Sequence, residues 1–511
     1  MSDDSPDVLF VVLDTVRQDH LGPYGYDRPT TPTLDAFAEE AVVYEEAVAP
    51  APWTLPVHAS LFTGLYPSQH GATQETPYLE GATTLAESLS AAGYDTACYS
   101  SNAWITPYTH LTDGFDEQDN FFEVMPGDLL SGPLARAWKA MNDNDRLRTL
   151  ANRLVQVGNK AHEYLAAGEG GDTKTPAVID QTTEFIESSA IGGSQGFFSF
   201  INLMDAHLPY HPPAEYVEQF APGVDSTAVC QNSKAYNCGA VDIDDDEWED
   251  IRGLYDAEIR HMDDQLGRLF DHLKAENLWD DTMAVVCADH GELHGEHDLY
   301  GHEFNIYDPL VNVPLLVKHP DLDPGRSDQQ VELLDLYHTV LDHVGVEGRG
   351  VELDERRSLL SDDYRAFDWE EGDGSDDAAT PETPRGEYAF VEYHRPVVEL
   401  EQLENKAGEA GIGLDADSRF YSRMRAARRP DGKYVRNERI ADEAYRLDRD
   451  PGETEDVLET GGDEVVAGVE AALRTFEATV GGEWNDVDGD DPLADMGDEA
   501  KSRLQDLGYL E

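Results

Sequence analysis

Short, uninterrupted apolar runs that alternate with helical patterns constrain the fold of this chain most strongly. Each run is bounded by polar residues, which is typical of a strand buried on both faces of a parallel sheet. The runs lie at residues 7–13, 196–203, 283–288 and 313–317. Apolar residues at helical spacing lie between them, at 33–42, 83–92 and 258–274. This alternation predicts an α/β fold with a mostly parallel central sheet flanked by helices.

The remaining segments suggest how the 511 residues divide into domains. We expect a first domain over residues 1–360, with a polar helical insertion at 125–190 and an acidic loop at 222–250. Residues 361–386 read as an acidic flexible excursion, and residues 481–511 as an acidic tail. Between these two lies a smaller C-terminal α+β domain, residues 387–480. Its antiparallel strands are predicted at 388–393, 424–428 and 433–435, and its helix at about 464–479.

The charge of the chain excludes some classes of partner. Asp and Glu total 105 against 36 Lys and Arg, a formal net charge of −69, which disfavours nucleic acid and anionic membranes. Because 40% of the residues are hydrophobic, a folded core with an acidic surface fits better than disorder. Such a surface suits molar salt, where the Debye length is about 3 Å. We therefore expect a halophilic protein; an acidic protein at ordinary salt is the alternative.

The N-terminal segment, the length of the apolar runs and the cysteines indicate the cellular compartment. Met1–Pro6 is polar and acidic, and the first apolar run is too short for a signal peptide. Because no stretch approaches 18 apolar residues, we expect no membrane anchor and a cytoplasmic location. Two of the four cysteines lie in strand-like runs, whereas Cys230 and Cys238 flank a polar loop and could pair.

Side chains with metal-binding chemistry follow three of the predicted strands. Asp14 follows the first, Asp205 and His207 the second, and Asp289-His290 the third. Ligands of α/β sheets bind at the carboxyl ends of strands, and a carboxylate with an imidazole suits a divalent cation. Taken alone, each signal has a plainer reading, because an Asp at a strand end more often caps a helix.

A fourth signal lies at Thr54 and His58, four residues apart in a segment that begins Pro52-Trp53. On the first turns of a helix both side chains would share one face, where the positive end of the helix favours an anion. The plainer reading is that Thr54 only caps the helix.

The chain resembles the sulfatase family of the alkaline-phosphatase superfamily. Seven motifs carry the resemblance in order across about 450 residues: 14–26, 54–64, 114–116, 205–209, 288–297, 313–317 and 444–453. The resemblance implies a sulfatase-like catalytic domain over residues 1–360 and a hydrolase acting on ester bonds. It also implies that the predicted sheet and helices form an alkaline-phosphatase-like fold.

The departures from the family pattern concern the anion site. True sulfatases carry Cys or Ser where this chain has Thr54, and a maturation enzyme converts that residue to formylglycine. A secondary alcohol cannot give an aldehyde by that route, so Thr54 is similar instead to the nucleophile of the superfamily's phosphatases and phosphodiesterases. His58 replaces an Arg, His302 replaces a downstream Lys, and Thr15 replaces the second Asp of the opening pair. Ser101–Trp104 matches the usual Gly-Lys-Trp-His stretch only loosely.

The resemblance implies a site with one divalent cation. Asp14, Asp289 and His290 would bind it, and the oxygen of Thr54 would complete the site and become nucleophilic. The nitrogen ligand favours Zn or Mn over Ca, and Mg is also considered. His207 and His302 would contact the leaving oxygen, and His58 would position the nucleophile rather than transfer a proton. A second metal on Asp205, His207 and His302 is the less favoured alternative.

Several functions remain open at this point. We favour a hydrolase of phosphate mono- or diesters because of Thr54. The alternatives are a true sulfuric ester hydrolase of the arylsulfatase type, a phosphotransferase to a glycan or lipid, and a non-catalytic relative that binds an anion. In each enzymatic case the substrate is a small-molecule or glycan ester that carries sulfate or phosphate.

Overall fold

The computed structural model describes residues 6–120, 174–192, 194–361, 364, 388–458 and 462–484. Its main sheet has eight strands in the order β10-β2-β9-β6-β1-β5-β3-β4. Their bounds are Asp7–Leu13 (β1), Val42–Val48 (β2), Asp95–Ser100 (β3), Glu117–Asn120 (β4), Phe197–Leu203 (β5), Thr282–Cys287 (β6), Asn312–Lys318 (β9) and Gly325–Glu332 (β10). The central pairs β1–β5, β1–β6 and β3–β5 are parallel, so the predicted fold class is confirmed.

Strand β9 differs from the expectation for its apolar run. It pairs antiparallel with both of its neighbours, β2 and β6. The short helix α11 (Asp308–Val311) leads directly into β9, so the chain enters the sheet from the carboxyl end of β6 and runs back. A strand that is buried on both faces has the same apolar pattern in either direction, so the sequence did not reveal this reversal.

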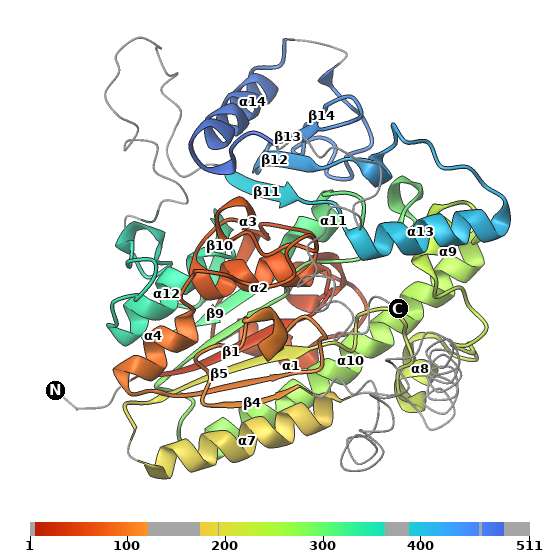
Figure 1. The fold of residues 1–511 in the computed structure, drawn as a ribbon. Coiled ribbons are helices and arrows are strands. Elements are labelled where there is room, and N and C mark those ends of the chain that lie inside the picture. Colours follow the sequence, from red (N-terminus) through yellow and green to blue (C-terminus); the bar gives the residue numbers. More distant parts are fainter. Residues whose placement is uncertain are drawn as a thin grey trace, which may run out of the picture.

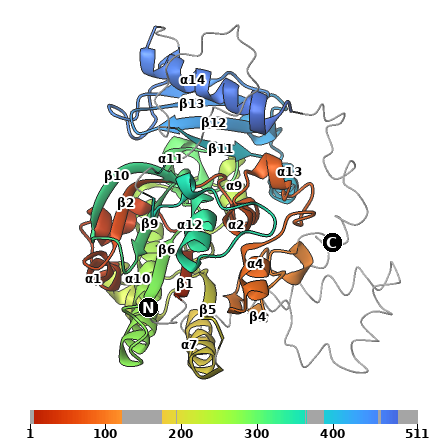
Figure 2. The same ribbon diagram turned by 90° about the vertical axis from the view of Figure 1, so that its left-hand side faces the viewer.

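Helices cover both faces of the main sheet, which therefore forms the middle of three layers (Figure 2). One group consists of α1 (Pro32–Ala38), α7 (Thr175–Gly192) and α10 (Asp245–Ala275). The other consists of α2 (Thr54–Thr63), α4 (Leu85–Ala92) and α12 (Asp335–Val344). The shorter helices α3 (Pro67–His70), α8 (Ala214–Phe220) and α9 (Ser233–Asn237) lie outside these groups.

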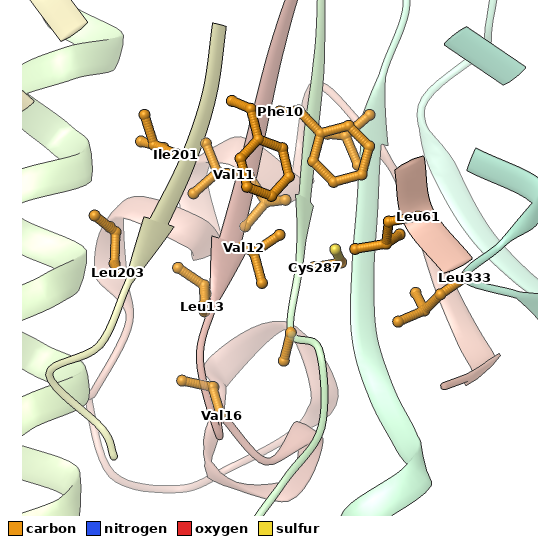
Figure 3. Close-up of a cluster of buried hydrophobic side chains, with 14 of the residues drawn as sticks. Phe10, Val11, Val12, Leu13, Val16, Leu61, Ile201, Leu203, Cys287 and Leu333 are labelled. Atoms are coloured by element: carbon orange, nitrogen blue, oxygen red, sulfur yellow. The ribbon is translucent and has the colours of Figure 1, made fainter. Parts of the chain in front are cut away.

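The apolar core is centred on the first predicted strand. Every residue of β1 after Asp7 is buried. Its side chains contact those of the neighbouring strands β5 and β6 and of α2, including Ile201, Cys287 and Leu61 (Figure 3). Because adjacent side chains of a strand point to opposite faces, a continuous apolar run is what a strand between two helix layers requires.

A second, four-stranded antiparallel sheet lies above the first (Figure 1). Its strands are β11 (Ala389–Tyr393), β12 (Met424–Arg429), β13 (Gly432–Asn437) and β14 (Glu443–Tyr445), and α14 (Glu464–Phe476) packs on it. The predicted antiparallel sheet with its helix is therefore confirmed. Between β11 and β12 the chain forms α13 (Val397–Ala410), which was not predicted and lies beside α9 (Figure 1).

Other expectations need correction in detail. The helix predicted at 33–42 ends at Ala38, because the β-branched segment that follows is strand β2. The helix predicted at 258–274 begins at Asp245, where the carboxylate of Asp244 caps it, so residues 245–250 of the expected acidic loop 222–250 are helical. Most of the predicted insertion at 125–190, of the excursion at 361–386 and of the tail at 481–511 lies outside the described residues.

The structure also shows the state of the cysteines and the character of the helices. Cys230 and Cys238 carry free thiols rather than a disulfide, and the thiols of Cys98 and Cys287 are buried in strands β3 and β6. None of the helices in the described ranges has both the length and the apolar character needed to cross a bilayer.

A buried ion cluster joins the two sheets. The carboxylate of Asp308, at the start of α11, accepts hydrogen bonds from Arg428 at 2.8 Å and from Lys433 at 3.0 Å. Lys433 is fully buried and also lies 2.9 Å from Glu453. Burial opposes ionisation of Asp308, but these two cations outweigh it and hold its pKa well below the usual range. This carboxylate therefore stabilises the junction at neutral pH.

We expect Asp308→Asn to lower the free energy of unfolding by about 3 kcal/mol, because it leaves two buried cations without their shared partner. Urea unfolding followed by circular dichroism measures this loss. The control is Asp448→Asn, whose carboxylate is 39% exposed beside Arg446 and whose loss costs less than about 1 kcal/mol. Equal losses in the two variants would show that the cluster does not hold the sheets together.

Candidate active site

The carboxyl edge of the central strands brings distant residues together. Asp14 directly follows β1, and its backbone amide donates to the carbonyl of Leu203 at the end of β5. Asn202 lies near the same end of β5, paired in register with Val12, and Asp289 follows β6. The parallel pairing of these three strands therefore places their final side chains at one edge, as the sequence predicted.

Asp14, Asp289 and His290 form the one cluster of acidic and histidine residues, among those described, with the geometry of a metal site. One ligand atom from each lies within 4.8 Å of the other two, and all three residues are buried. Asp14 Oδ1, Asp289 Oδ2 and His290 Nε2 have no hydrogen-bond partner. Buried polar atoms are normally paired, so three orphaned acceptors that face one another fit a divalent cation.

The other atoms of these residues are fixed by neighbours. Asp14 Oδ2 accepts from the side-chain amides of Asn102 at 2.7 Å and Asn202 at 3.1 Å. Asp289 Oδ1 accepts from the backbone amides of Thr15 at 3.2 Å and His290 at 2.9 Å. Burial, with the nearby charge of Asp14, raises the pKa of Asp289, whereas burial lowers the pKa of His290. A cation would relieve the repulsion between the two carboxylates.

Thr54 is the first residue of α2 and lies beside this cluster. The same Asn102 amide that holds Asp14 donates to Thr54 Oγ1 at 3.2 Å. His58, one turn later, donates through Nδ1 to the carbonyl of Thr54 at 2.9 Å and is fully buried. Burial lowers the pKa of His58 to about 4, so its ring is neutral. This arrangement agrees with a role for His58 in positioning the helix start.

His302 and His207 lie near His290 and line the same cavity as Thr54. The ring centroid of His302 is 4.5 Å from that of His290 and 5.3 Å from that of His207. The Nδ1 atom of His302 lies 3.2 Å from Glu292 Oε1. Burial alone would lower the pKa of His302, but the carboxylates of Glu292 and Glu303 raise it to about 9. The ring is therefore a cation at neutral pH in this environment.

The alternative of a second metal has little geometric support. Asp205 accepts from His261 Nδ1 at 2.7 Å and from the hydroxyl of Thr175, so it is engaged away from His207 and His302. The basic residues at 423–429 lie on β12 or directly before it, where Arg423 and Arg425 pair with Glu438 and Glu392.

Two cavities open onto the site. The smaller, about 300 Å³, is lined in part by Thr54, Asn102 and Trp104, and the larger, about 870 Å³, by Glu292. Both share His207 and His302. They also share residues that the sequence analysis missed: Lys234 from α9, Glu303, and Gln402 from α13.

The two asparagines that hold Asp14 were also missed. A polar Asn202 inside an otherwise apolar run was a usable signal, because a buried amide needs a specific partner. Asn102 lies in the segment 101–104 that matched the family pattern only loosely, so nothing in the sequence indicated its contact with Asp14.

We expect Asn102→Ala to weaken metal binding by about 10- to 100-fold, because residues that orient ligands are worth this much. The carboxylate of Asp14 would lose its 2.7 Å donor and turn within the site. Calorimetric titration with Mn²⁺ measures the affinity. The control is Asn437→Ala, whose amide donates to Ala441 in the small sheet and whose loss should leave the affinity unchanged. An unchanged affinity in both variants would contradict the orienting role.

This geometry and the comparisons with known proteins define a hydrolase that acts on ester bonds. More particularly, the chain belongs to the Sulfatase family, whose model matches residues 6–346. It is 25% identical over 360 residues to the uncharacterized sulfatase YidJ of Escherichia coli, covering 67% of this chain and 68% of the relative. It is 28% identical over 392 residues to the multifunctional alkaline phosphatase superfamily protein PehA of Trinickia caryophylli, covering 66% and 74%.

A solved structure confirms the fold. The phosphonate monoester hydrolase of Agrobacterium radiobacter superposes with a TM-score of 0.64 at 21% identity, and the match covers 93% of this chain and 95% of the other. This similarity extends well beyond the 6–346 segment, so it includes the small sheet. Members of this superfamily depend on metal ions, in agreement with the orphaned ligand atoms of the cluster.

Proposed function

We propose that the protein is a metal-dependent hydrolase of phosphate mono- and diesters and that Thr54 is its nucleophile. The observation that carries the proposal is the shared amide of Asn102, which ties the Thr54 hydroxyl to the carboxylate of Asp14. A threonine at this position has no route to formylglycine, so the hydroxyl itself must act. Phosphate esters are the substrates that alcohol nucleophiles of this superfamily attack.

Asp14, Asp289 and His290 would hold the cation, with the hydroxyl of Thr54 beside it. When bound, a divalent metal would act as a Lewis acid and favour the ionised form of that hydroxyl. We infer one ion, and the single nitrogen ligand favours Zn or Mn over Ca. The support is the set of three orphaned atoms, two of them oxygen and one nitrogen.

The residues of the chain would act in two stages. Thr54 Oγ1 forms a bond to phosphorus as the bond to the leaving oxygen breaks on the opposite side. Backbone amides at the start of α2 bind the equatorial oxygens. His207 and His302 contact the leaving oxygen and supply its proton. In the first stage the proton of the Thr54 hydroxyl passes to solvent. In the second stage a water oxygen bonds to phosphorus as the bond to Thr54 Oγ1 breaks, and the histidine that protonated the leaving oxygen takes a proton from that water. Thr54 Oγ1 recovers a proton from solvent, and the product is phosphate from a monoester or a phosphate monoester from a diester.

Hydrolysis of sulfate esters is the second candidate. It is favoured by the family and by relatives such as the arylsulfatase of Clostridium perfringens, which is 24% identical over 399 residues. In that case the unmodified Thr54 would attack sulfur.

We further propose that the protein works in the cytoplasm of a halophile, since its net charge of −69 requires dense screening.

The deciding experiment is an assay of purified, metal-loaded protein in molar KCl with 4-nitrophenyl phosphate, bis(4-nitrophenyl) phosphate and 4-nitrophenyl sulfate. We expect cleavage of the phosphate esters at rates well above that of the sulfate. Faster cleavage of the sulfate would establish the second candidate instead. No turnover of any ester, with metal bound, would refute both. Repeating the assay at 0.1 M KCl tests the salt requirement, because a halophilic protein should lose activity there.

A further inference from the structure

Thr15 directly follows the proposed metal ligand Asp14 and has a backbone conformation that is unusual for a residue of its type. It is fully buried, and its φ of 59° lies in the left-handed region. A β-branched residue rarely adopts this conformation, because it brings the Cβ atom too close to the following carbonyl oxygen. Such strain persists only where surrounding contacts enforce it, and it is concentrated at functional sites.

Each polar group of Thr15 is bound to a different part of the fold. The backbone amide donates to Asp289 Oδ1, after β6, at 3.2 Å. The backbone carbonyl accepts from the hydroxyl of Tyr255 on α10 at 2.7 Å. The side-chain hydroxyl lies 2.6 Å from the carbonyl oxygen of Ala206, after β5, and 2.7 Å from that of Asp14. Thr15 therefore joins the loops that follow β1, β5 and β6.

The amide contact fixes the carboxylate of Asp289. Because Oδ1 accepts from the amides of Thr15 and His290, Oδ2 is the atom left without a partner. The chain around Thr15 is held on one side by β1 and on the other by Tyr255. A change of φ at Thr15 would therefore rotate the preceding peptide plane and turn the N–H away from Asp289.

The hydroxyl contact holds the turn that carries His207. The carbonyl of Met204 accepts from the amide of His207 at 3.0 Å, and this bond closes the turn around Ala206. Asp205 in this turn is held separately by α10. A hydroxyl has one proton to donate. When Thr15 donates it to Ala206, the turn is tied to a loop 191 residues earlier in the chain.

We propose that Thr15 is a positioning residue that aligns the metal carboxylate of Asp289 with His207. Its left-handed backbone presents the N–H to Asp289, and its hydroxyl fixes the turn before His207, so the two keep a constant spacing. Thr15 stands where the family pattern has a second Asp, but its hydroxyl is directed at carbonyl oxygens. The inference rests on the proposed function, in which His207 contacts the leaving oxygen.

Three substitutions separate the two contacts. Thr15→Ser keeps both, because serine retains the hydroxyl. Thr15→Gly keeps the left-handed backbone, which glycine adopts without strain, and removes the hydroxyl. Thr15→Val keeps the branched shape but removes the hydroxyl that helps to hold the strained backbone. The control is Thr182→Val in α7, whose buried hydroxyl donates to the carbonyl of Val178 at 2.7 Å and lines neither cavity.

Calorimetric titration of the metal-free variants with Mn²⁺ measures the effect of the amide contact. We expect Thr15→Ser, Thr15→Gly and Thr182→Val to bind within about threefold of the wild type, and Thr15→Val to bind about 10- to 100-fold more weakly, the range for residues that orient ligands. Circular dichroism shows whether each variant is folded. Wild-type affinity in folded Thr15→Val overturns the role toward Asp289.

The effect of the hydroxyl contact is measured with Mn²⁺-saturated variants and two leaving groups. The substrates are 4-nitrophenyl and phenyl esters, of phosphate or of methyl phosphate according to which class the wild type cleaves. 4-Nitrophenolate leaves without a proton, whereas phenolate needs the proton that His207 would help to supply. We expect Thr15→Gly to raise the ratio of kcat/KM for the nitrophenyl ester to that for the phenyl ester by about tenfold, and Thr15→Ser and Thr182→Val to leave it unchanged.

The two possible failures are distinguishable. An equal loss on both esters in Thr15→Gly would show a merely structural role and overturn the role toward His207, while the hydrolase remains. If the wild type cleaves no phosphate ester of either class, the proposed function fails and the role toward His207 fails with it. The first failure appears only in the variant, and the second appears in the wild type.

Discussion

Replacing Thr54 by alanine should abolish ester hydrolysis, with kcat reduced by about 10⁴-fold or more for every ester that the wild type cleaves. The variant removes the oxygen that Asn102 holds beside Asp14 but leaves the three orphaned ligand atoms in place. Steady-state kinetics with 4-nitrophenyl esters measures the loss. Calorimetric titration with Mn²⁺ checks that the remaining ligands still bind metal.

Two companion variants and one measurement sharpen this prediction. Thr54→Ser keeps an alcohol at the same position and should retain measurable turnover. His58→Ala removes the donor to the Thr54 carbonyl and a buried ring that packs on Phe62 and Phe200, and it should lower kcat less than Thr54→Ala does. Intact mass spectrometry should show the unmodified threonine. Full activity in Thr54→Ala would refute the nucleophile and require water to attack directly.

Replacing Asp289 by asparagine should separate metal binding from folding. The wild type should gain about 2.7 kcal/mol in the free energy of unfolding when Mn²⁺ is present at 100 times its Kd, and the variant should gain almost none. Without metal, Asp289→Asn should be more stable than the wild type. The reason is that burial and the charge of Asp14 both disfavour the Asp289 carboxylate. Activity should fall by about 10³-fold or more, the equivalent of several kcal/mol of transition-state stabilisation.

The matched control for this prediction is Asp256→Asn. Asp256 is equally buried, but it accepts from His20 at 2.7 Å and from Arg28, away from the proposed metal ligands. Its loss should destabilise the metal-free protein and leave the gain from Mn²⁺ intact, which is the opposite of the Asp289 result. If Asp289→Asn still gained stability from Mn²⁺, the cation would have to bind elsewhere.

The sequence predicted those parts of the site that depend on regular structure. Asp14 and Asp289-His290 follow buried strands, and Thr54 begins a helix. Once the strands are known to be parallel, their final residues must meet at one edge, and the structure brings Asp14, Asp289 and His290 within 4.8 Å of one another. The class of fold followed from the same reasoning.

The parts that could not be predicted depend on loops and on strand direction. The contact between Asn102 and Asp14 spans 88 residues, and no local pattern signals it. The direction of β9 was hidden because strands buried on both faces share one apolar pattern in either direction. Helix α13 was missed altogether, so the contribution of its Gln402 to the cavity wall came only from the structure.

The position of Gln402 has an evolutionary consequence. The family model matches residues 6–346, yet α13 at Val397–Ala410 contributes Gln402 to the walls of both cavities at the site. A change in the C-terminal portion can therefore alter which substrates the protein accepts, while the proposed metal ligands and nucleophile stay the same. Classification by the shared segment alone therefore groups together enzymes that act on different substrates.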